Sequence, residues 1–109
     1  MHKLKKRPQF QKVYKKGKSF KTPYIILSIL ANNLDYNRIG VSAALKNTGI
    51  SVRRNRTRRL LTETYRLTED SLKRGFDMVL TCRRDLSQLG LKDVTTEINK
   101  LYRGADILQ

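Results

Sequence analysis

The chain has 109 residues, enough for one domain with a modest core, and it carries 24 Lys and Arg against 9 Asp and Glu, a formal net charge of +15 at pH 7. With 39% hydrophobic residues, no Trp and no apolar run of 18 residues, the composition excludes a transmembrane helix. A single cysteine, Cys82, excludes an intrachain disulfide framework, and no apolar segment follows the basic N-terminus as a secretory signal requires. We therefore expect one domain over residues 1–109 and a cytoplasmic location.

The excess positive charge is confined to two blocks. Residues 1–18 carry eight Lys or Arg and no acid, and residues 46–66 carry seven Lys or Arg and one acid. Residues 67–109 carry seven of each sign and balance. Such asymmetry indicates a surface for a polyanion rather than general solubility. Nucleic acid is favoured over an anionic membrane, because the arginine-rich block lacks the Trp or Phe that would seat a helix in a lipid interface.

The N-terminal half predicts one helix and three strands. Residues 1–7 form a basic segment that we expect to be a mobile arm. A short amphipathic helix is expected over Pro8–Lys16, because Phe10, Val13 and Tyr14 fall on one stripe and Pro suits a first helical position. The strands expected after it are a short one near Ser19–Phe20, a long one over Tyr24–Ala31, and a second long one, antiparallel to the first, over Arg38–Ala44.

The C-terminal half predicts a long helix, a strand and a last helix. The long helix carries most of the arginines and runs to about Ser71. Alternating apolar residues over 76–82 indicate a strand, and the last helix, which ends at Gly104, carries an apolar stripe at Leu91, Val94, Ile98, Leu101 and Tyr102. This order predicts a single-domain α+β fold with the helices on one face of a mixed sheet. The strand after the long helix is able to lie parallel to an earlier strand.

The most informative stretch runs from Arg53 to Arg66 and reads RRNRTRRLLTETYR. Six of its fourteen residues are Arg, and only Glu63 is acidic. A helical wheel separates an arc of Leu60, Leu61, Thr64 and Tyr65 from an arc of Asn55, Arg58, Arg59 and Arg66. Guanidinium groups are planar, always charged and bidentate, which suits phosphate. Because so many like charges repel one another, a polyanion site is favoured over a merely solvated face.

The sequence offers no convincing catalytic apparatus. His2, the single histidine, lies in the N-terminal segment, which excludes a histidine general base in the core. Cys82 lies in a strand pattern and is interpreted as a buried structural thiol. The acidic residues are scattered without the spacing of a metal site, and Asp77, at the start of a strand, is expected to be solvated. We therefore expect no catalytic and no metal-binding residue in this chain.

Three motifs follow one another along the chain. They are Phe10-Gln11-Lys12-Val13-Tyr14 followed by Gly17, then Arg38-Ile39-Gly40-Val41-Ser42 on a strand, then Arg54-Asn55-Arg56 leading into Arg58-Arg59-Leu60. In order and spacing they resemble the protein subunit of bacterial ribonuclease P, over nearly the whole chain and least after about residue 84.

The resemblance implies an αβββαβα sandwich with a left-handed crossover. It also implies that an RNA subunit cleaves the phosphodiester bond with bound Mg²⁺, without an organic cofactor. The protein would bind that RNA and the single-stranded 5′ leader of precursor tRNA, and would lower the Mg²⁺ requirement. Neither DNA nor a membrane is expected as a partner.

The resemblance also divides the predicted site residues between two surfaces. The surface for the RNA subunit comprises Lys46, Arg53, Arg54, Asn55, Arg56, Arg58, Arg59 and Arg66. The cleft for the leader comprises Phe10, Lys12, Tyr14, Lys15, Tyr24 and Ile26. One departure from the family pattern is the segment Ala43–Gly49, in which Lys46 alone stands for a usual pair of lysines.

Alternatives stay open for the site and for the function. By pattern alone, Phe10 and Tyr14 are more often core residues of a short helix than stacking platforms, a preference that the resemblance reverses. A structural RNA-binding protein of the ribosome or another ribonucleoprotein is the alternative function, and it needs the arginine helix but no solvent-facing aromatic pair. A protein-only nuclease is disfavoured, because no cluster of carboxylates or histidines is present to hold a metal.

Overall fold

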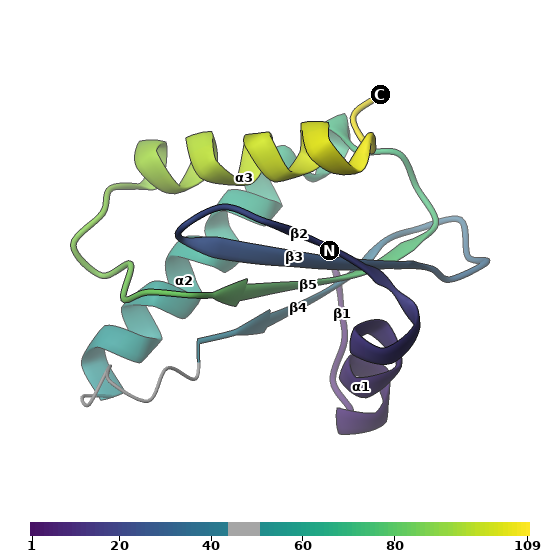
Figure 1. Ribbon diagram of the computed structural model, residues 1–109, viewed down its shortest axis with the longest axis horizontal. Coiled ribbons are helices and arrows are strands. Elements are labelled where there is room, and N and C mark those ends of the chain that lie inside the picture. Colours follow the sequence, from purple (N-terminus) through teal and green to yellow (C-terminus); the bar gives the residue numbers. More distant parts are fainter. Residues whose placement is uncertain (44–50) are drawn as a thin grey trace.

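The structure is a computed structural model that describes residues 1–43 and 51–109 (Figure 1). Its elements are β1 (His2–Lys3), α1 (Arg7–Lys16), β2 (Lys18–Lys21), β3 (Ile25–Ala31), β4 (Arg38–Ser42), α2 (Ser51–Thr68), a short 3-10 helix (Glu69–Ser71), β5 (Phe76–Cys82) and α3 (Leu91–Ala105). The predicted α+β class is confirmed, and the predicted helices and strands agree with these bounds to within a few residues. No helix in the described ranges is long and apolar enough to cross a bilayer.

The five strands form one mixed sheet in the order β1-β4-β5-β3-β2. β5 lies in the centre, antiparallel to β3 and parallel to β4. The strand beginning at Arg38 runs antiparallel to the preceding long strand, as predicted, but the two are not paired, because β5 lies between them. The prediction that the strand after the long helix lies parallel to an earlier one is confirmed. The chain crosses over through α2 from β4 to β5, which allows these two strands to be parallel. β5 lies between β4 and β3 and pairs with both. The left-handedness of this crossover stays a prediction.

Helices cover both faces of the sheet, not one face as the sequence predicts. Leu27, Ile29 and Met78 point into the main core, which α2 and α3 close on one face. Val79 points to the opposite face and joins a second, smaller cluster that α1 closes. In Figure 1, α3 lies above the strands of the sheet, and α1 lies below them. The central strands are apolar on both faces of the sheet. The apolar stripe of α1 therefore packs on a second apolar patch, separate from the main core.

The first residues form part of the sheet, which corrects the expectation of a mobile arm over residues 1–7. His2–Lys3 pairs in parallel with the first residues of β4, and the backbone N–H of Leu4 donates to the carbonyl of Ile39 at 2.9 Å. The Leu4 side chain is only 5% exposed and packs with Val13 of α1. A strand of two residues carries no periodicity, so pattern analysis overlooks it.

Candidate nucleic-acid interface

The buried residues on the inner face of helix α2 fix the rotation of the helix about its own axis. Burial of the Tyr65 side chain raises the pKa of its hydroxyl far above the ordinary value. Near the helix end, the hydroxyl of Thr68 lies 2.9 Å from that of Tyr102 on α3. The buried residues of the helix are Thr57, Leu61, Thr64 and Tyr65, and all six arginines and Asn55 are exposed. The helix therefore packs by one side and presents its guanidinium groups to solvent.

A turn that follows β5 anchors one flank of α2. Arg56 Nε donates to the backbone carbonyl of Ser87 at 2.6 Å, and Arg53 lies 3.9 Å from the carboxylate of Asp85. Asp85 in turn accepts the backbone N–H of Ser87 at 2.9 Å, and that hydrogen bond is the main reason why its pKa lies below the ordinary value. These contacts give Arg53 and Arg56 partners within the protein, which sequence analysis did not predict.

The remaining side chains of the arginine block face outward. No hydrogen bond or ion pair joins Arg54, Asn55, Arg58 or Arg59 to another side chain among residues 1–43 and 51–109. Arg66, two turns further on, is paired with Glu63, its Nε lying 3.1 Å from a carboxylate oxygen. Lys46, the other residue predicted for this surface, lies outside the described residues. The four outward residues at 54–59 are thus the part of the block that is most available to phosphate groups.

The stripe of α1 divides between the core and the solvent. Val13 is fully buried with Leu4. Phe10 is half-buried, and its ring lies so close to Gly40 that a Cβ at that position would stand 2.4 Å from the ring. Tyr14 is 48% exposed, and its hydroxyl lies 3.4 Å from Oγ1 of Thr81. The structure therefore divides the aromatic pair, with Phe10 packed on the sheet and Tyr14 presented to solvent.

Beside Tyr14, the face of the sheet that α1 leaves uncovered carries small polar and aliphatic side chains. Thr81 is in register with Ile26 on one side and with Ser42 on the other, and all three are half-buried. Lys21 lies opposite Ile26 at the edge of the sheet. We call Tyr14, Ile26, Thr81 and Ser42 the aromatic surface. Sequence analysis missed Thr81 and Ser42, although their alternation with the core residues of β5 and β4 was the signal that could have found them.

The other residues predicted for the leader cleft lie in two places. Lys12 and Lys15 are exposed on α1. Tyr24 precedes β3 and packs against the main core, with the guanidinium carbon of Arg84 5.5 Å from its ring centroid. The structure thus brings Ile26 close to Tyr14 through Thr81, whereas Tyr24 is part of the core boundary.

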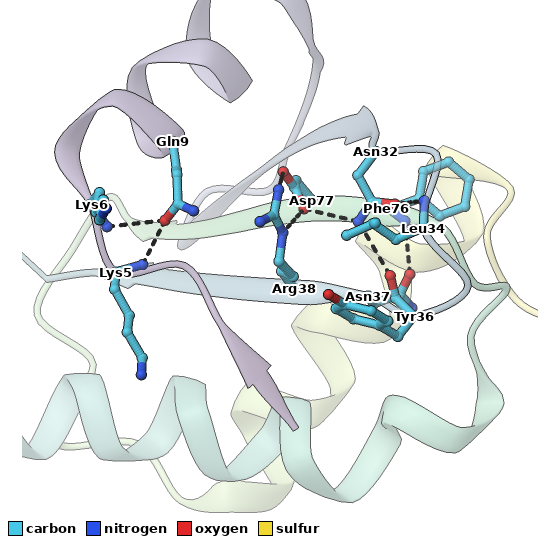
Figure 2. A network of polar contacts seen from close by, with 10 residues as sticks. All are labelled: Lys5, Lys6, Gln9, Asn32, Leu34, Tyr36, Asn37, Arg38, Phe76 and Asp77. Carbon is cyan, nitrogen blue, oxygen red and sulfur yellow. Dashed lines mark hydrogen bonds and ion pairs between the residues drawn. The ribbon is translucent and has the colours of Figure 1, made fainter.

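Asp77 is buried and paired, which corrects the expectation that it is solvated. Arg38 donates to both of its carboxylate oxygens at 2.7 Å, and the amide of Asn32 donates to one of them at 2.9 Å (Figure 2). Burial opposes ionisation of Asp77, but the hydrogen bonds from Arg38 and Asn32 outweigh it and hold the pKa below its ordinary value. This network fastens the beginning of β4 to the beginning of β5.

The titratable residues of the described chain form no metal site. Among residues 1–43 and 51–109 there is no group of three or more His, Cys, Asp or Glu that could hold an ion. Cys82 is buried, and that burial raises the pKa of its thiol, which makes it a poor nucleophile. The His2 ring is stacked on Tyr36, with ring centroids 4.1 Å apart.

Comparison with known sequences agrees with this geometry. The family model for ribonuclease P matches residues 1–106. The chain is 42% identical to the ribonuclease P protein component of Clostridioides difficile over 105 residues, which cover 95% of this chain and 91% of that one. It is 40% identical to the ribonuclease P protein component of Natranaerobius thermophilus over 106 residues, which cover 97% and 91%.

Comparison with solved structures gives the same result for the fold. The ribonuclease P protein from Thermotoga maritima superimposes with a TM-score of 0.81 at 28% identity, covering 93% of this chain and 94% of that one. A ribonuclease P protein mutant from Staphylococcus aureus superimposes with a TM-score of 0.87, covering 98% and 90%. At 22% identity, that second likeness concerns the fold alone.

Proposed function

The chain belongs to the ribonuclease P protein family, the protein part of the endoribonuclease that processes the 5′ end of precursor tRNA, and from this we propose how its surfaces serve that reaction. Helix α2 binds the RNA subunit, and the aromatic surface beside α1 binds the single-stranded 5′ leader. The observation that carries the first assignment is the outward cluster of Arg54, Asn55, Arg58 and Arg59 on a helix whose rotation is fixed. The alternative of a structural protein of another ribonucleoprotein is not favoured by the comparisons.

The arginine cluster suits an RNA that is already folded. A folded RNA presents phosphates at set distances, and planar guanidinium groups on one helix face contact them bidentately. Such contacts position the protein without reading sequence. Each contact releases counterions, so affinity should fall steeply with salt.

The aromatic surface suits a single strand of varied sequence. The exposed ring of Tyr14 offers a stacking platform, and stacking tolerates any base. Lys12 and Lys15 lie on the same helix and are exposed, in position to follow the leader backbone. Phe10 acts mainly by holding α1 on the sheet through its contact with Gly40.

The cleavage chemistry belongs to the RNA subunit, with Mg²⁺ bound mainly by that RNA and no organic cofactor. This assignment is supported by the lack of a carboxylate or histidine cluster among the described residues. The protein contributes charge: +15 on a small chain offsets repulsion between the phosphates of the catalytic RNA and the substrate, and so lowers the Mg²⁺ needed. We place this activity in the cytoplasm.

Reconstitution tests the proposal. The chain is mixed with a bacterial ribonuclease P RNA, and 5′ processing of precursor tRNA is followed at low Mg²⁺, with the RNA alone and the protein alone as controls. We expect processing only when both are present. Cleavage by rigorously RNA-free protein, or no effect of the protein on the Mg²⁺ dependence, would contradict the proposal.

A further inference from the structure

We propose that the basic segment Lys3–Arg7 is an additional RNA-binding surface, which holds the backbone of the ribonuclease P RNA. The segment contains Lys3, Lys5, Lys6 and Arg7 and no acidic residue. It shares no residue with the outward arginine cluster of α2 or with the aromatic surface, and we call it the N-terminal strip. The inference rests on the function proposed above and adds a partner contact to it.

The backbone of the N-terminal strip is fixed. β1 pairs with β4, and the Leu4 side chain is buried against α1. The side-chain oxygen of Gln9 accepts the backbone N–H groups of Lys5 and Lys6 at 2.9 and 3.0 Å (Figure 2). Because the backbone is held on both sides of Leu4, the points from which the cationic side chains project are fixed. Binding then costs less conformational entropy than it would for a mobile tail.

Two of the cations open onto a common hollow. Lys3 and Lys5, together with His2, Tyr36 and Arg38, line a hollow of about 370 Å³ at the edge of the sheet. In Figure 2, the Lys5 side chain points away from α1. The charge of Arg38 is neutralised by Asp77, so the positive charge offered to a ligand comes from Lys3 and Lys5.

The N-terminal strip and the aromatic surface are separated by the packing of α1. Along β5, Thr81 contacts Tyr14, Val79 lies in the apolar cluster of α1, and Asp77 pairs with Arg38 beside the strip. A leader strand lying on Tyr14 therefore does not reach the strip without crossing helix α1.

The chemistry of the strip fits a folded RNA better than a leader. The rings of His2 and Tyr36 are stacked on each other at 4.1 Å, tilted by 37°, so one face of each ring is already used. A single strand is bound mainly by stacking on exposed rings. Lysines that project from a fixed backbone around a hollow suit the phosphates and sugars of a structured RNA, whose own spacing is fixed.

The test compares two variants that each remove two positive charges. Lys3→Gln/Lys5→Gln changes the strip, and Lys92→Gln/Arg103→Gln changes two exposed residues of helix α3. Affinity for a bacterial ribonuclease P RNA is measured over a range of salt concentrations, beside a melting curve. Affinities of the reconstituted enzyme for precursor and mature tRNA are measured in parallel.

We expect the strip variant to bind the RNA subunit about 2- to 30-fold more weakly, as two exposed ion contacts of ordinary strength imply. The slope of log affinity against log salt should fall by about 1.4 to 1.8, at roughly 0.7 to 0.9 for each contact. The α3 variant should bind as the unmodified chain does, and the ratio of precursor to mature tRNA affinity should stay the same in both.

Three results would overturn the inference. Equal losses in the two variants would mean that only net charge matters. An unchanged affinity and slope in the strip variant would mean that the segment is solvated, and a changed ratio of precursor to mature tRNA affinity would assign the segment to the substrate. If the unmodified chain itself fails to bind the RNA, the proposed function fails, which is a separate outcome. Gln9→Ala tests the fixed backbone, because it keeps every charge but should still weaken binding.

Discussion

Replacing Tyr14 by Ala should weaken the binding of precursor tRNA to the reconstituted enzyme and leave the binding of mature tRNA unchanged. The ring is 48% exposed, so a base has room to stack on it. Stacking contributes about 1–3 kcal/mol per base, which corresponds to a loss of about 5- to 150-fold in affinity. The melting temperature should change little, because the buried residue of α1 is Val13 and not Tyr14.

Two matched variants separate stacking from packing. Tyr14→Phe keeps the ring and removes only the hydroxyl contact to Thr81, which at 3.4 Å is long for a hydrogen bond, so affinity should stay within about twofold. Phe10→Ala should lower the melting temperature instead, because its half-buried ring fastens α1 to Gly40. A fully buried Phe→Ala change costs about 3–5 kcal/mol, and we expect about half of that here.

The assay is equilibrium binding of precursor and mature tRNA by each reconstituted enzyme, beside a melting curve of the protein. Equal losses for the two tRNAs on replacing Tyr14, together with a lower melting temperature, would refute the assignment. Tyr14 would then be a packing residue, and the leader would have to bind elsewhere.

Three further predictions follow from the packing. Arg59→Ala should reduce the salt slope of RNA-subunit binding by roughly 0.7 to 0.9 at an unchanged melting temperature, whereas Arg56→Ala should lower the melting temperature as well, because its guanidinium holds the turn after β5. Gly40→Ala should destabilise the fold by about 1–3 kcal/mol, measured by denaturant unfolding, because the added Cβ would meet the ring of Phe10 at 2.4 Å; full stability would show that this ring moves aside easily. Because Arg38 and Asn32 lower the pKa of Asp77, the stability that this carboxylate adds is present above its unfolded pKa of about 3.9 and is lost as the pH falls through the lower folded value. Asp77→Asn should therefore make the free energy of unfolding depend less on pH in the acid range. An unchanged pH dependence would show that the ion pair is not linked to folding.

The elements with long periodic patterns could be predicted from the sequence. The strand over 76–82 and the inner face of α2 agree with the structure because their apolar residues recur at the period of a strand or a helix. The arginine block could be assigned to an exposed face for the same reason. Such patterns involve only residues that are near one another in the sequence, so they predict local secondary structure.

Strand pairing and the division of the aromatic pair could not be predicted in this way. β4 and β3 are joined by a turn rich in Asn, yet each pairs with β5, which comes more than 30 residues later in the chain. Phe10 and Tyr14 lie one turn apart on the same stripe, and only the position of Gly40 under one ring decides which is packed. The turn at Asp85 that holds Arg56 has no pattern of its own, since its contacts are made across the fold.

The place of β5 in the centre of the sheet has a consequence for the newly made chain. β3 and β4 are synthesised first, but each finds its central neighbour only when residues 76–82 have left the ribosome. Until then both strands have an unpaired inner edge, and contacts so distant in sequence form slowly. The arginines of α2 emerge before the strand that completes their scaffold, so the nascent chain is cationic before it is folded. We therefore expect folding in a single late step, and a chain truncated before Phe76 should be both unfolded and prone to bind RNA without specificity.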